Sequence, residues 1–342
     1  MSEATPLRAF GEADGDIADL GGRTIAFIGY GNQGRAQALN LRDSGVAGIV
    51  VGVPKDRSRD EAMEDGFEVR TVAEAAEAGD ILFLLIPDEV LPEVFRDEIA
   101  AHVKAGDTLV FASGYNLMFE GVTPPDGVDV VMLAPRMIGR QARELFTKGE
   151  GFYSYISVER DASGRAWPTL LALAKGIGTL RGGAFEISAE QETLIDLYME
   201  QGFGAIFGSL VFQALSVATE AGLPAEAMIL ELYLSGEMAQ TLTAMAELGF
   251  VEQSRLHSLT SQYGGMTRSI RLDREPLRKH LQQALDEIKS GTFAREWAAE
   301  RASGYKNFSQ LRDLAGAANP FSAAEERLNA AVREAQARGK GP

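Results

Sequence analysis

The chain has 342 residues, of which 45% are hydrophobic, and this length suggests about two domains of roughly 150 residues each. The net charge of −16 argues against nucleic acid or an anionic membrane as the main partner, because phosphate binding needs clustered cations. The absence of cysteine excludes disulfides and thiolate chemistry, and the three scattered histidines (His102, His257 and His280) argue against a histidine-built metal site.

The N-terminal residues and the apolar runs indicate whether the chain carries a targeting signal or a membrane span. Residues 1–20 carry acidic side chains and show no basic segment followed by an apolar one, so we expect no signal peptide. We also find no run approaching the roughly 20 apolar residues that a membrane span needs. These two observations predict a cytoplasmic protein.

The first half of the chain predicts strands that alternate with helices. Residues 1–22 are polar and are expected to form a short arm. Helices are predicted after the first strand and at 61–65 and 72–78. Compact apolar runs predict strands at 23–29, 48–53, 80–86, 108–112, 128–133 and 153–158, and 68–71 is predicted to form a further strand. This alternation is typical of an α/β domain with a doubly wound parallel sheet, which we assign to residues 1–186.

Strand patterns almost disappear after about residue 188. Long helical patterns cover 189–222, 224–248 and 276–289. We therefore predict an all-helical domain over 187–330, followed by a charged tail over 331–342 that frays.

A glycine motif follows the first predicted strand. Gly29-Tyr30-Gly31-Asn32-Gln33-Gly34 fits G-x-G-x-x-G and opens a helix, which is the context that favours dinucleotide binding over a merely flexible turn. The first glycine allows the tight turn, the second lets the backbone approach a pyrophosphate, and the third allows close packing of helix and strand. The pyrophosphate would lie at the helix N-terminus.

Asp56 lies just past the second strand, near the distance at which an acidic side chain meets the adenine ribose. A carboxylate there favours NAD over NADP, because it repels a 2′-phosphate. Four neighbouring side chains could instead hold that phosphate: Lys55, Arg57, Ser58 and Arg59. Ile86-Pro87-Asp88-Glu89 ends another strand, at the sheet edge where ligands bind.

Three carboxylates are spaced four residues apart in the first helix of the second domain. Glu192, Asp196 and Glu200 share one helical face, and no lysine or arginine of that helix separates them. The helix is apolar nearly all round, which predicts that it is buried together with its acidic side chains. Because buried unpaired carboxylates are costly, a divalent cation such as Mg²⁺ would explain them. We assign the metal role to Asp196 and Glu200, whereas Glu192 could be peripheral or the three could form a solvated acidic stripe.

A second predicted helix carries Glu231, Tyr233, Ser235 and Glu237. Glu231 faces Ser235 and Tyr233 faces Glu237, each pair one turn apart, and Gly236 could bend the helix. Ser258 lies in a polar stretch and could donate a hydroxyl to a substrate carboxylate.

These motifs together resemble the ketol-acid reductoisomerase family in its short bacterial form, over nearly the whole chain. The resemblance rests on the segments IGYGNQGRAQALNLRDSG, IPDEV, ALAKGIGTLRGG, QETLIDLYMEQ, QYGGMTRS and GTFAREW. It implies an N-terminal Rossmann domain, an all-helical C-terminal domain intertwined with its twin in a homodimer, and two Mg²⁺ ions.

The resemblance also implies roles for particular residues. Asp196 matches the bridging aspartate of the family, Glu200 matches the glutamate one turn later, and Ser258 matches the serine that holds the substrate carboxylate. The family has a Glu-x-x-x-Glu pair that the partner subunit contributes to the site. Here that pair falls either on Glu231 and Ser235 or on Tyr233 and Glu237, so one glutamate is missing.

Other departures from the family lie near the expected chemistry. The S-H-G-F-N segment of the family reads Ser113-Gly114-Tyr115-Asn116 here after Ala112, and we count Ser113 and Gly114 among the cofactor-binding candidates. In the segment A-P-K-G-P-G-H, the lysine is replaced by Arg136, and Met137 and Ile138 replace the following Gly-Pro. This exchange is not conservative, because arginine cannot readily give up its proton.

The resemblance and these departures predict a reductoisomerase-like enzyme that binds NAD and Mg²⁺ and acts on a 2,3-dihydroxy or 2-keto-3-hydroxy acid. We expect it to be repurposed for specialised metabolism. Some divergent members of the family close a cyclopropanol ring, and this chain could be one of them. The first alternative is acetohydroxyacid isomeroreductase activity in valine and isoleucine synthesis. The second is a catalytically silent NAD-binding regulator, against which the retained Asp196 and Glu200 argue.

Overall fold

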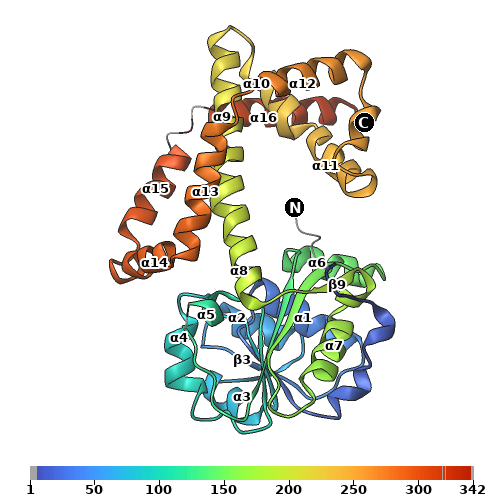
Figure 1. Cartoon of the computed structure of the whole chain (residues 1–342), viewed down its shortest axis with the longest axis vertical. Coiled ribbons are helices and arrows are strands. Elements are labelled where there is room, and N and C mark those ends of the chain that lie inside the picture. Colours follow the sequence, from blue (N-terminus) through green and yellow to red (C-terminus); the bar gives the residue numbers. More distant parts are fainter. Residues whose placement is uncertain (1–5, 120, 318, 320, 340–342) are drawn as a thin grey trace. The chain divides into compact units, whose positions relative to one another are not determined.

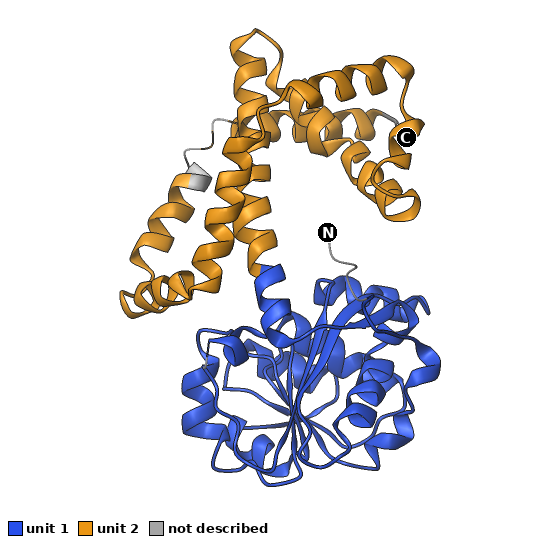
Figure 2. Cartoon of the chain, in the orientation of Figure 1, with its two compact units in different colours: residues 1–196 blue, residues 197–342 orange. Residues whose placement is uncertain are grey.

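The computed structural model describes residues 6–119, 121–317, 319 and 321–339. The chain divides into two compact units, Met1–Asp196 and Leu197–Pro342, which Figure 2 shows in blue and orange.

The first unit is built on a nine-stranded sheet in the order β1-β9-β8-β7-β6-β5-β2-β3-β4. Strands β7, β6, β5, β2, β3 and β4 run parallel, whereas β8 pairs antiparallel with β7, and β1 pairs antiparallel with β9. The α/β class is therefore confirmed, but the sheet is mixed at one side rather than wholly parallel. The strands are β1 (Ala9–Phe10), β2 (Ile25–Ile28), β3 (Ile49–Gly52), β4 (Glu68–Arg70), β5 (Ile81–Leu84), β6 (Thr108–Phe111), β7 (Asp129–Pro135), β8 (Tyr153–Arg160) and β9 (Gly183–Glu186).

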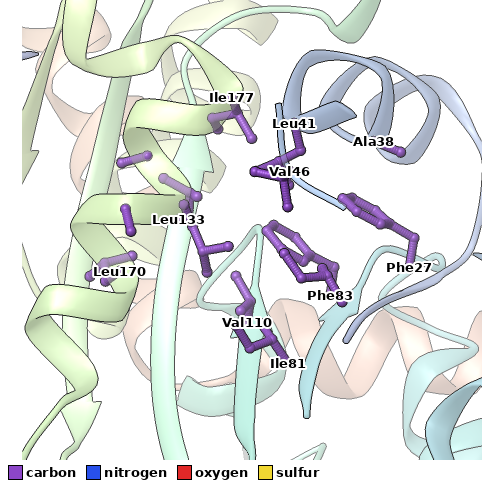
Figure 3. Close-up of a cluster of buried hydrophobic side chains, with 14 of the residues drawn as sticks. Phe27, Ala38, Leu41, Val46, Ile81, Phe83, Val110, Leu133, Leu170 and Ile177 are labelled. Carbon is purple, nitrogen blue, oxygen red and sulfur yellow. The ribbon is translucent and has the colours of Figure 1, made fainter. Parts of the chain in front are cut away.

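Helices cover both faces of this sheet (Figure 1). Alternate side chains of each central strand enter opposite cores, since successive residues of a strand point to opposite faces. Phe27 and Phe83 stack with ring centroids 4.6 Å apart in the core beside α1 and α7 (Figure 3). Ala26 and Leu82 enter the other core, beside α3. This burial on both faces explains why the central strands are continuous apolar runs in the sequence.

The helices of the first unit are η1 (Glu12–Asp14), η2 (Ile17–Leu20), α1 (Asn32–Asp43), α2 (Arg57–Glu64), α3 (Val72–Ala78), α4 (Leu91–Val94), η3 (Phe95–Ile99), α5 (Tyr115–Met118), α6 (Gly139–Thr147), α7 (Ala166–Ile177), η4 (Thr179–Arg181) and α8 (Ala189–Tyr198). Residues 6–22, the described part of the expected polar arm, do not form a loose extension. Phe10 is buried and stacks on Trp167, and Leu20 is buried in the same core. The arm expectation is wrong here, because these few apolar side chains are enough to dock the segment.

The second unit is helical throughout its described residues. Its helices are η5 (Met199–Gly204), α9 (Ala205–Glu220), α10 (Ala225–Ile229), η6 (Leu230–Leu234), α11 (Glu237–Leu248), η7 (Glu252–Leu256), α12 (Leu259–Arg271), α13 (Glu275–Lys289), α14 (Thr292–Ala302), α15 (Lys306–Ala317) and α16 (Ser322–Gly339). A small core joins α9, α10 and α16 through Leu215, Ile229, Phe321 and Ala324. The predicted fraying tail is helical as far as Gly339, and 340–342 lie outside the described residues.

One helix, Ala189–Glu220, is long and apolar enough to cross a membrane by length and composition alone. The expectation that no segment meets those two criteria is therefore wrong, since residues 201–219 contain no charged side chain. Several large apolar side chains of this helix are exposed in the single chain, among them Phe203, Phe207, Leu210 and Val217.

Candidate functional site: a dinucleotide turn and an arginine–carboxylate cluster

The three glycines of the motif sit in three different environments. Gly29 follows β2 with a φ of 103°, in the left-handed region that glycine favours, and a Cβ there would lie 2.5 Å from the carbonyl oxygen of Leu85. A Cβ on Gly34, in the first turn of α1, would lie 2.3 Å from the carbonyl oxygen of Gly29. A Cβ on Gly31 would meet nothing within 4 Å. The backbone at Gly31 is therefore open to a ligand, while Gly29 and Gly34 are required by the fold.

A cavity of about 470 Å³ opens beside this turn, at the carboxyl ends of β2, β3 and β5. The chain passes from β2 to β3 on one side of β2 and returns to β5 on the other, which makes this the switch point at which α/β sheets bind ligands. Seven of the predicted cofactor-binding residues line the cavity: Gly29, Tyr30, Gly31, Asp56, Ser58, Ile86 and Pro87. Val53, Thr71 and Glu98 also line it, and no sequence motif singled them out.

Asp56 occupies the N-cap position of α2. Its carboxylate accepts hydrogen bonds from the backbone N–H of Ser58 at 2.9 Å and from the Ser58 hydroxyl at 2.5 Å. The bonds from Ser58 lower the pKa of Asp56, so this carboxylate is ionised at neutral pH. Of the cations that could favour a 2′-phosphate, Lys55 lines the cavity, whereas Arg57 and Arg59 are not among its lining residues and Arg57 pairs with Glu61 at 2.8 Å.

Tyr30 anchors the glycine turn to the far end of α2. Its side chain is buried, and its hydroxyl donates to Asp65 at 2.9 Å. Arg35 donates to both oxygens of Asp65, at 2.7 and 3.1 Å. Although burial opposes ionisation of Asp65, the bonds from Arg35 and Tyr30 lower its pKa. Asp65 and Arg35 lie 30 residues apart, so sequence reasoning missed this link.

The other cofactor candidates point elsewhere in the first unit. Asn32 accepts from the backbone N–H of Arg140, and Gln33 donates to the carbonyl of Met137. The carboxylate and carbonyl of Asp88 accept from Asn116.

Ser113 and Gly114 precede α5, and neither is among the residues that line the cavity. The Ser113 hydroxyl accepts from the backbone N–H of Tyr115. Gly114 packs against α8, where a Cβ would lie 2.1 Å from the carbonyl oxygen of Ala189.

Arg136 lies just after β7 and bridges two carboxylates of α8. Its guanidinium donates through Nη1 to Glu192 at 3.0 Å and through Nη2 to Asp196. The ring of Tyr155 lies 5.2 Å from the guanidinium carbon, within cation–π range. Burial disfavours the charged guanidinium, but Asp196 and Glu192 together raise the pKa of Arg136, so it stays charged.

Glu192 is the most buried member of this cluster, with its side chain 1% exposed, whereas that of Asp196 is 36% exposed. Its second oxygen accepts from the backbone N–H of Gly114 at 2.8 Å. Burial raises the pKa of Glu192 to about 7. Glu192 therefore occupies a central place in the cluster and is not the peripheral side chain that was one interpretation of the sequence. The expected burial of the helix with all its acidic residues is wrong for Asp196, which is partly exposed, and for Glu200, which is exposed.

The candidates of the second unit are spread over several elements. Glu200 lies in the π-helical segment η5, so the regular α-helical face assumed for 192–200 ends with α8. Glu231 and Tyr233 lie in η6, and Gly236, with a φ of 82°, separates them from Glu237 at the start of α11. The expected one-turn pairing of Tyr233 with Glu237 is wrong, because the left-handed Gly236 breaks the helix between them, whereas Glu231 and Ser235 both precede this glycine.

Two hydroxyl groups of this unit already have partners. The Tyr233 hydroxyl donates to Glu325 of α16, and burial with this bond raises the pKa of Tyr233 to about 12. Ser258 caps α12 by accepting from the backbone N–H of Ser261 at 3.2 Å.

The fit of a divalent metal can be judged from the carboxylates themselves. In the part of the chain that the structure describes, no three Asp, Glu or His side chains form a group that could hold a metal ion. The carboxylate of Asp196 is paired with Arg136 instead. The described arrangement does not fit a preformed Mg²⁺ site.

Two family models match the chain in succession. Residues 19–183 match the NADPH-binding domain of acetohydroxy acid isomeroreductase, and residues 189–334 match the C-terminal domain of ketol-acid reductoisomerase. A protein of Saccharolobus solfataricus that carries the name ketol-acid reductoisomerase 3 is 41% identical, over 88% of this chain and 92% of its own length. The NADP⁺ ketol-acid reductoisomerase of Saccharopolyspora erythraea is 38% identical, over 90% and 92%. The structure of an NADH-preferring ketol-acid reductoisomerase from an uncultured archaeon superposes with a TM-score of 0.85 at 32% identity, covering 96% of this chain and 98% of that one.

Proposed function

Because the chain belongs to the ketol-acid reductoisomerase family, we propose that it is an NADH-preferring member that transfers hydride to or from a 2,3-dihydroxy or 2-keto-3-hydroxy acid. The chain is an NAD(P)-dependent oxidoreductase/isomerase of this family's type. The preference for NADH, the substrate and the steps that accompany hydride transfer are the proposed parts.

The contact of Arg136 with Glu192 and Asp196 carries the substrate proposal. Alkyl migration requires a group that takes a hydroxyl proton, and a lysine stands at this position in the family that the chain resembles. A guanidinium held by two carboxylates does not accept or release a proton at neutral pH. Losing one positioned acid–base group costs about 10²–10⁴-fold in rate, so we expect migration to be weak and hydride transfer to survive. A cyclopropanol-forming reaction is one outcome consistent with this proposal.

The cofactor assignment uses the cavity beside the glycine turn. The open backbone at Gly31 and the N-terminus of α1 would bind the pyrophosphate. Asp56 would accept from the adenine ribose hydroxyls and repel a 2′-phosphate. One relative has a name that specifies NADP⁺ and another is described as NADH-preferring, so the family accommodates both cofactors.

The Mg²⁺ assignment to Asp196 and Glu200 stays a prediction from the resemblance. A bound ion would supply Lewis-acid polarisation of substrate oxygens. Because the described carboxylates do not fit the ions, no step of the proposal depends on them. Ser258, Glu231 and Glu237 are proposed to contact substrate in the completed site.

A homodimer is the proposed state of the protein. Several large apolar side chains of α9 are exposed, and exposed apolar patches mark sites of protein interaction. A second copy is the occupant that the resemblance implies, since the family shares its helical domain between two subunits.

The alternative is acetohydroxyacid isomeroreductase activity in valine and isoleucine synthesis, which the likeness to acetohydroxy acid isomeroreductase and ketol-acid reductoisomerase supports equally. The silent regulator is less favoured, because Asp196 and Glu200 are both retained.

Turnover measurements discriminate among these proposals. The purified protein is incubated with Mg²⁺, NADH or NADPH, and either 2-acetolactate or a panel of hydroxy and keto acids, with products followed by mass spectrometry. We expect turnover of a panel member and very slow turnover of 2-acetolactate. A rate with 2-acetolactate of about 1 s⁻¹ or more, ordinary for a dedicated enzyme, would establish the alternative. No turnover of any compound would favour the regulator.

A further inference from the structure

The cavity beside the glycine turn is apolar over part of its wall. Val72 of α3, Ile86 just after β5, and Val90 and Val94 at the start and end of α4 contribute to this part. Val72 is buried, and the other three side chains are half-buried. Ligand cavities combine such apolar walls with a few polar groups that determine which ligand is accepted. The apolar part of this cavity therefore fits a flat ring system.

The bonding order of a dinucleotide places its adenine in this part of the cavity. This inference rests on the proposed function in one respect, because it takes Gly31 as the site of the pyrophosphate and Asp56 as the partner of the adenine ribose. The adenine is bonded directly to that ribose, so it lies in the same cavity, next to Asp56. The faces of a purine are apolar, whereas its edge carries hydrogen-bonding groups. A polar side chain of the cavity wall is therefore needed to distinguish one purine from another.

Glu98 is a polar side chain of this wall. It lies four residues after Val94, in the π-helical segment η3, and both residues line the cavity. The side chain of Glu98 is exposed, and its carboxylate has no hydrogen-bond or ion-pair partner in the part of the chain that the structure describes. The nearby cation, Arg96, donates to both oxygens of Asp97, at 2.6 and 2.8 Å. The carboxylate of Glu98 is therefore available to a ligand.

Two other polar side chains of the cavity wall already have partners. The hydroxyl of Ser58 donates to Asp56 at 2.5 Å, and that of Thr71 donates to Glu74 at 2.8 Å. With these hydroxyl groups engaged and Asp56 assigned to the ribose, Glu98 is the remaining carboxylate among the described residues that line the cavity.

We propose that Glu98 selects adenine over 6-oxopurines, by accepting a hydrogen bond from the 6-amino group of the cofactor's base. An ionised carboxylate only accepts hydrogen bonds. Adenine offers it the N–H donors of the 6-amino group, whereas hypoxanthine and guanine present a carbonyl oxygen at the same position, which the carboxylate repels. Asp56 and Glu98 then recognise different parts of one ligand, the ribose and the base.

Calorimetric titration of the full-length protein with NADH and with reduced nicotinamide hypoxanthine dinucleotide tests this proposal without relying on turnover. The two compounds carry the same charge and differ only in the base, so the ratio of their dissociation constants isolates recognition of the base. Because Glu98 is exposed, we expect a preference for NADH of about tenfold, rather than the roughly 10⁴-fold of a site built from buried polar groups.

Two variants assign this preference to a residue. E98Q should reduce it to about twofold or less, because an amide accepts from adenine and also donates to the carbonyl oxygen of hypoxanthine. D97N removes the same charge from the adjacent carboxylate, which is not among the lining residues of the cavity, and should leave the preference unchanged.

Each contrary result has a distinct meaning. Equal affinity of the unaltered protein for the two nucleotides refutes recognition of the base but leaves the NADH site intact. An unchanged preference in E98Q assigns the selection to another group, and an equal loss in D97N shows that charge alone matters, so either result overturns the role of Glu98. Binding of neither nucleotide at about 1 mM refutes the cofactor half of the proposed function together with this inference.

Discussion

Glu192 shows how the environment of one side chain changes its chemistry. Burial raises its pKa, while the nearby positive charge of Arg136 and the N–H of Gly114 favour its ionised form. The result is a carboxyl group that titrates near neutrality, beside the contact of Arg136 with Asp196. A group of this kind responds to pH in a range where ordinary glutamates do not.

The titration of Glu192 predicts a pH-dependent stability difference. The unfolded protein loses this proton near pH 4.5 and the folded protein near pH 7, so the contribution of Glu192 is complete below pH 4.5 and falls as pH rises to 7. Across the whole window the change is about 3 kcal/mol. Urea unfolding of the unaltered protein and of Glu192→Gln at pH 5 and pH 7.5 should show the unaltered protein losing stability relative to the variant. Parallel pH profiles would contradict this prediction.

Asp56 determines cofactor choice in our proposal. Asp56→Ser removes the carboxylate but keeps a side chain that can cap α2, so we expect NADPH to gain affinity relative to NADH by about tenfold or more. Calorimetric titration with both cofactors measures this change. Arg57→Gln, outside the cavity lining, is the matched control and should leave the ratio unchanged. A clear NADPH preference in the unaltered protein would refute the role of Asp56.

At the scale of elements, individual glycines are required for different physical reasons. Gly34 is needed because α1 approaches the turn after β2 too closely for a Cβ, whereas Gly31 meets no neighbouring atom. Gly236 ends one helical segment and lets the next begin in a new direction. The same residue type therefore serves packing, ligand access and a change of chain direction.

This difference predicts opposite behaviour for two alanine variants. Gly34→Ala should lower the melting temperature by several degrees, because its methyl group would overlap a backbone oxygen. Gly31→Ala should melt near the unaltered protein and lose NADH affinity, since its methyl group would occupy the space of the pyrophosphate. Thermal unfolding and NADH titration on both variants provide the comparison. Equal melting temperatures, or unchanged NADH binding in Gly31→Ala, would contradict it.

At the scale of the whole molecule, the helical unit exposes much of its apolar surface. Phe207 and Leu210 of α9 are 45% and 63% exposed, and the small core of α9, α10 and α16 does not cover them. An interface that buries these side chains would explain why the helix Ala189–Glu220 is long and apolar enough to meet the criteria of a membrane span. We expect a second copy of the chain to cover it.

Charge substitution tests this expectation. Leu210→Glu should convert a dimer into a monomer in sedimentation velocity, because an interface would bury the new carboxylate without a partner. Met63→Glu in α2 is a control on an apolar residue with similar exposure, 58%, and should remain dimeric. A monomeric unaltered protein at micromolar concentration, or a dimeric Leu210→Glu, would refute the proposed dimer.

Several features followed from the sequence by local physics. Seven of the nine strands were predicted, most of them from apolar runs, because central strands such as β2, β5 and β6 are buried on both faces and need apolar residues, whereas β4 is exposed or half-buried. The glycine motif predicted the tight turn and the close packing of α1, and the structure gives Gly29 a positive φ at that turn. The strands β1 and β9 were missed, because β1 has only two residues and β9, with the sequence Gly-Ala-Phe-Glu, is not an apolar run.

The partner of the carboxylates of α8 was decided by tertiary structure alone. The spacing of Glu192 and Asp196 placed both on one helical face, and the cost of burying like charges correctly required a cation. It could not say which cation, because Arg136 lies 56 residues before Glu192 and reaches it only when β7 and α8 pack together. Charge spacing within a helix is a local property, whereas the identity of the neutralising group depends on the packing of distant segments.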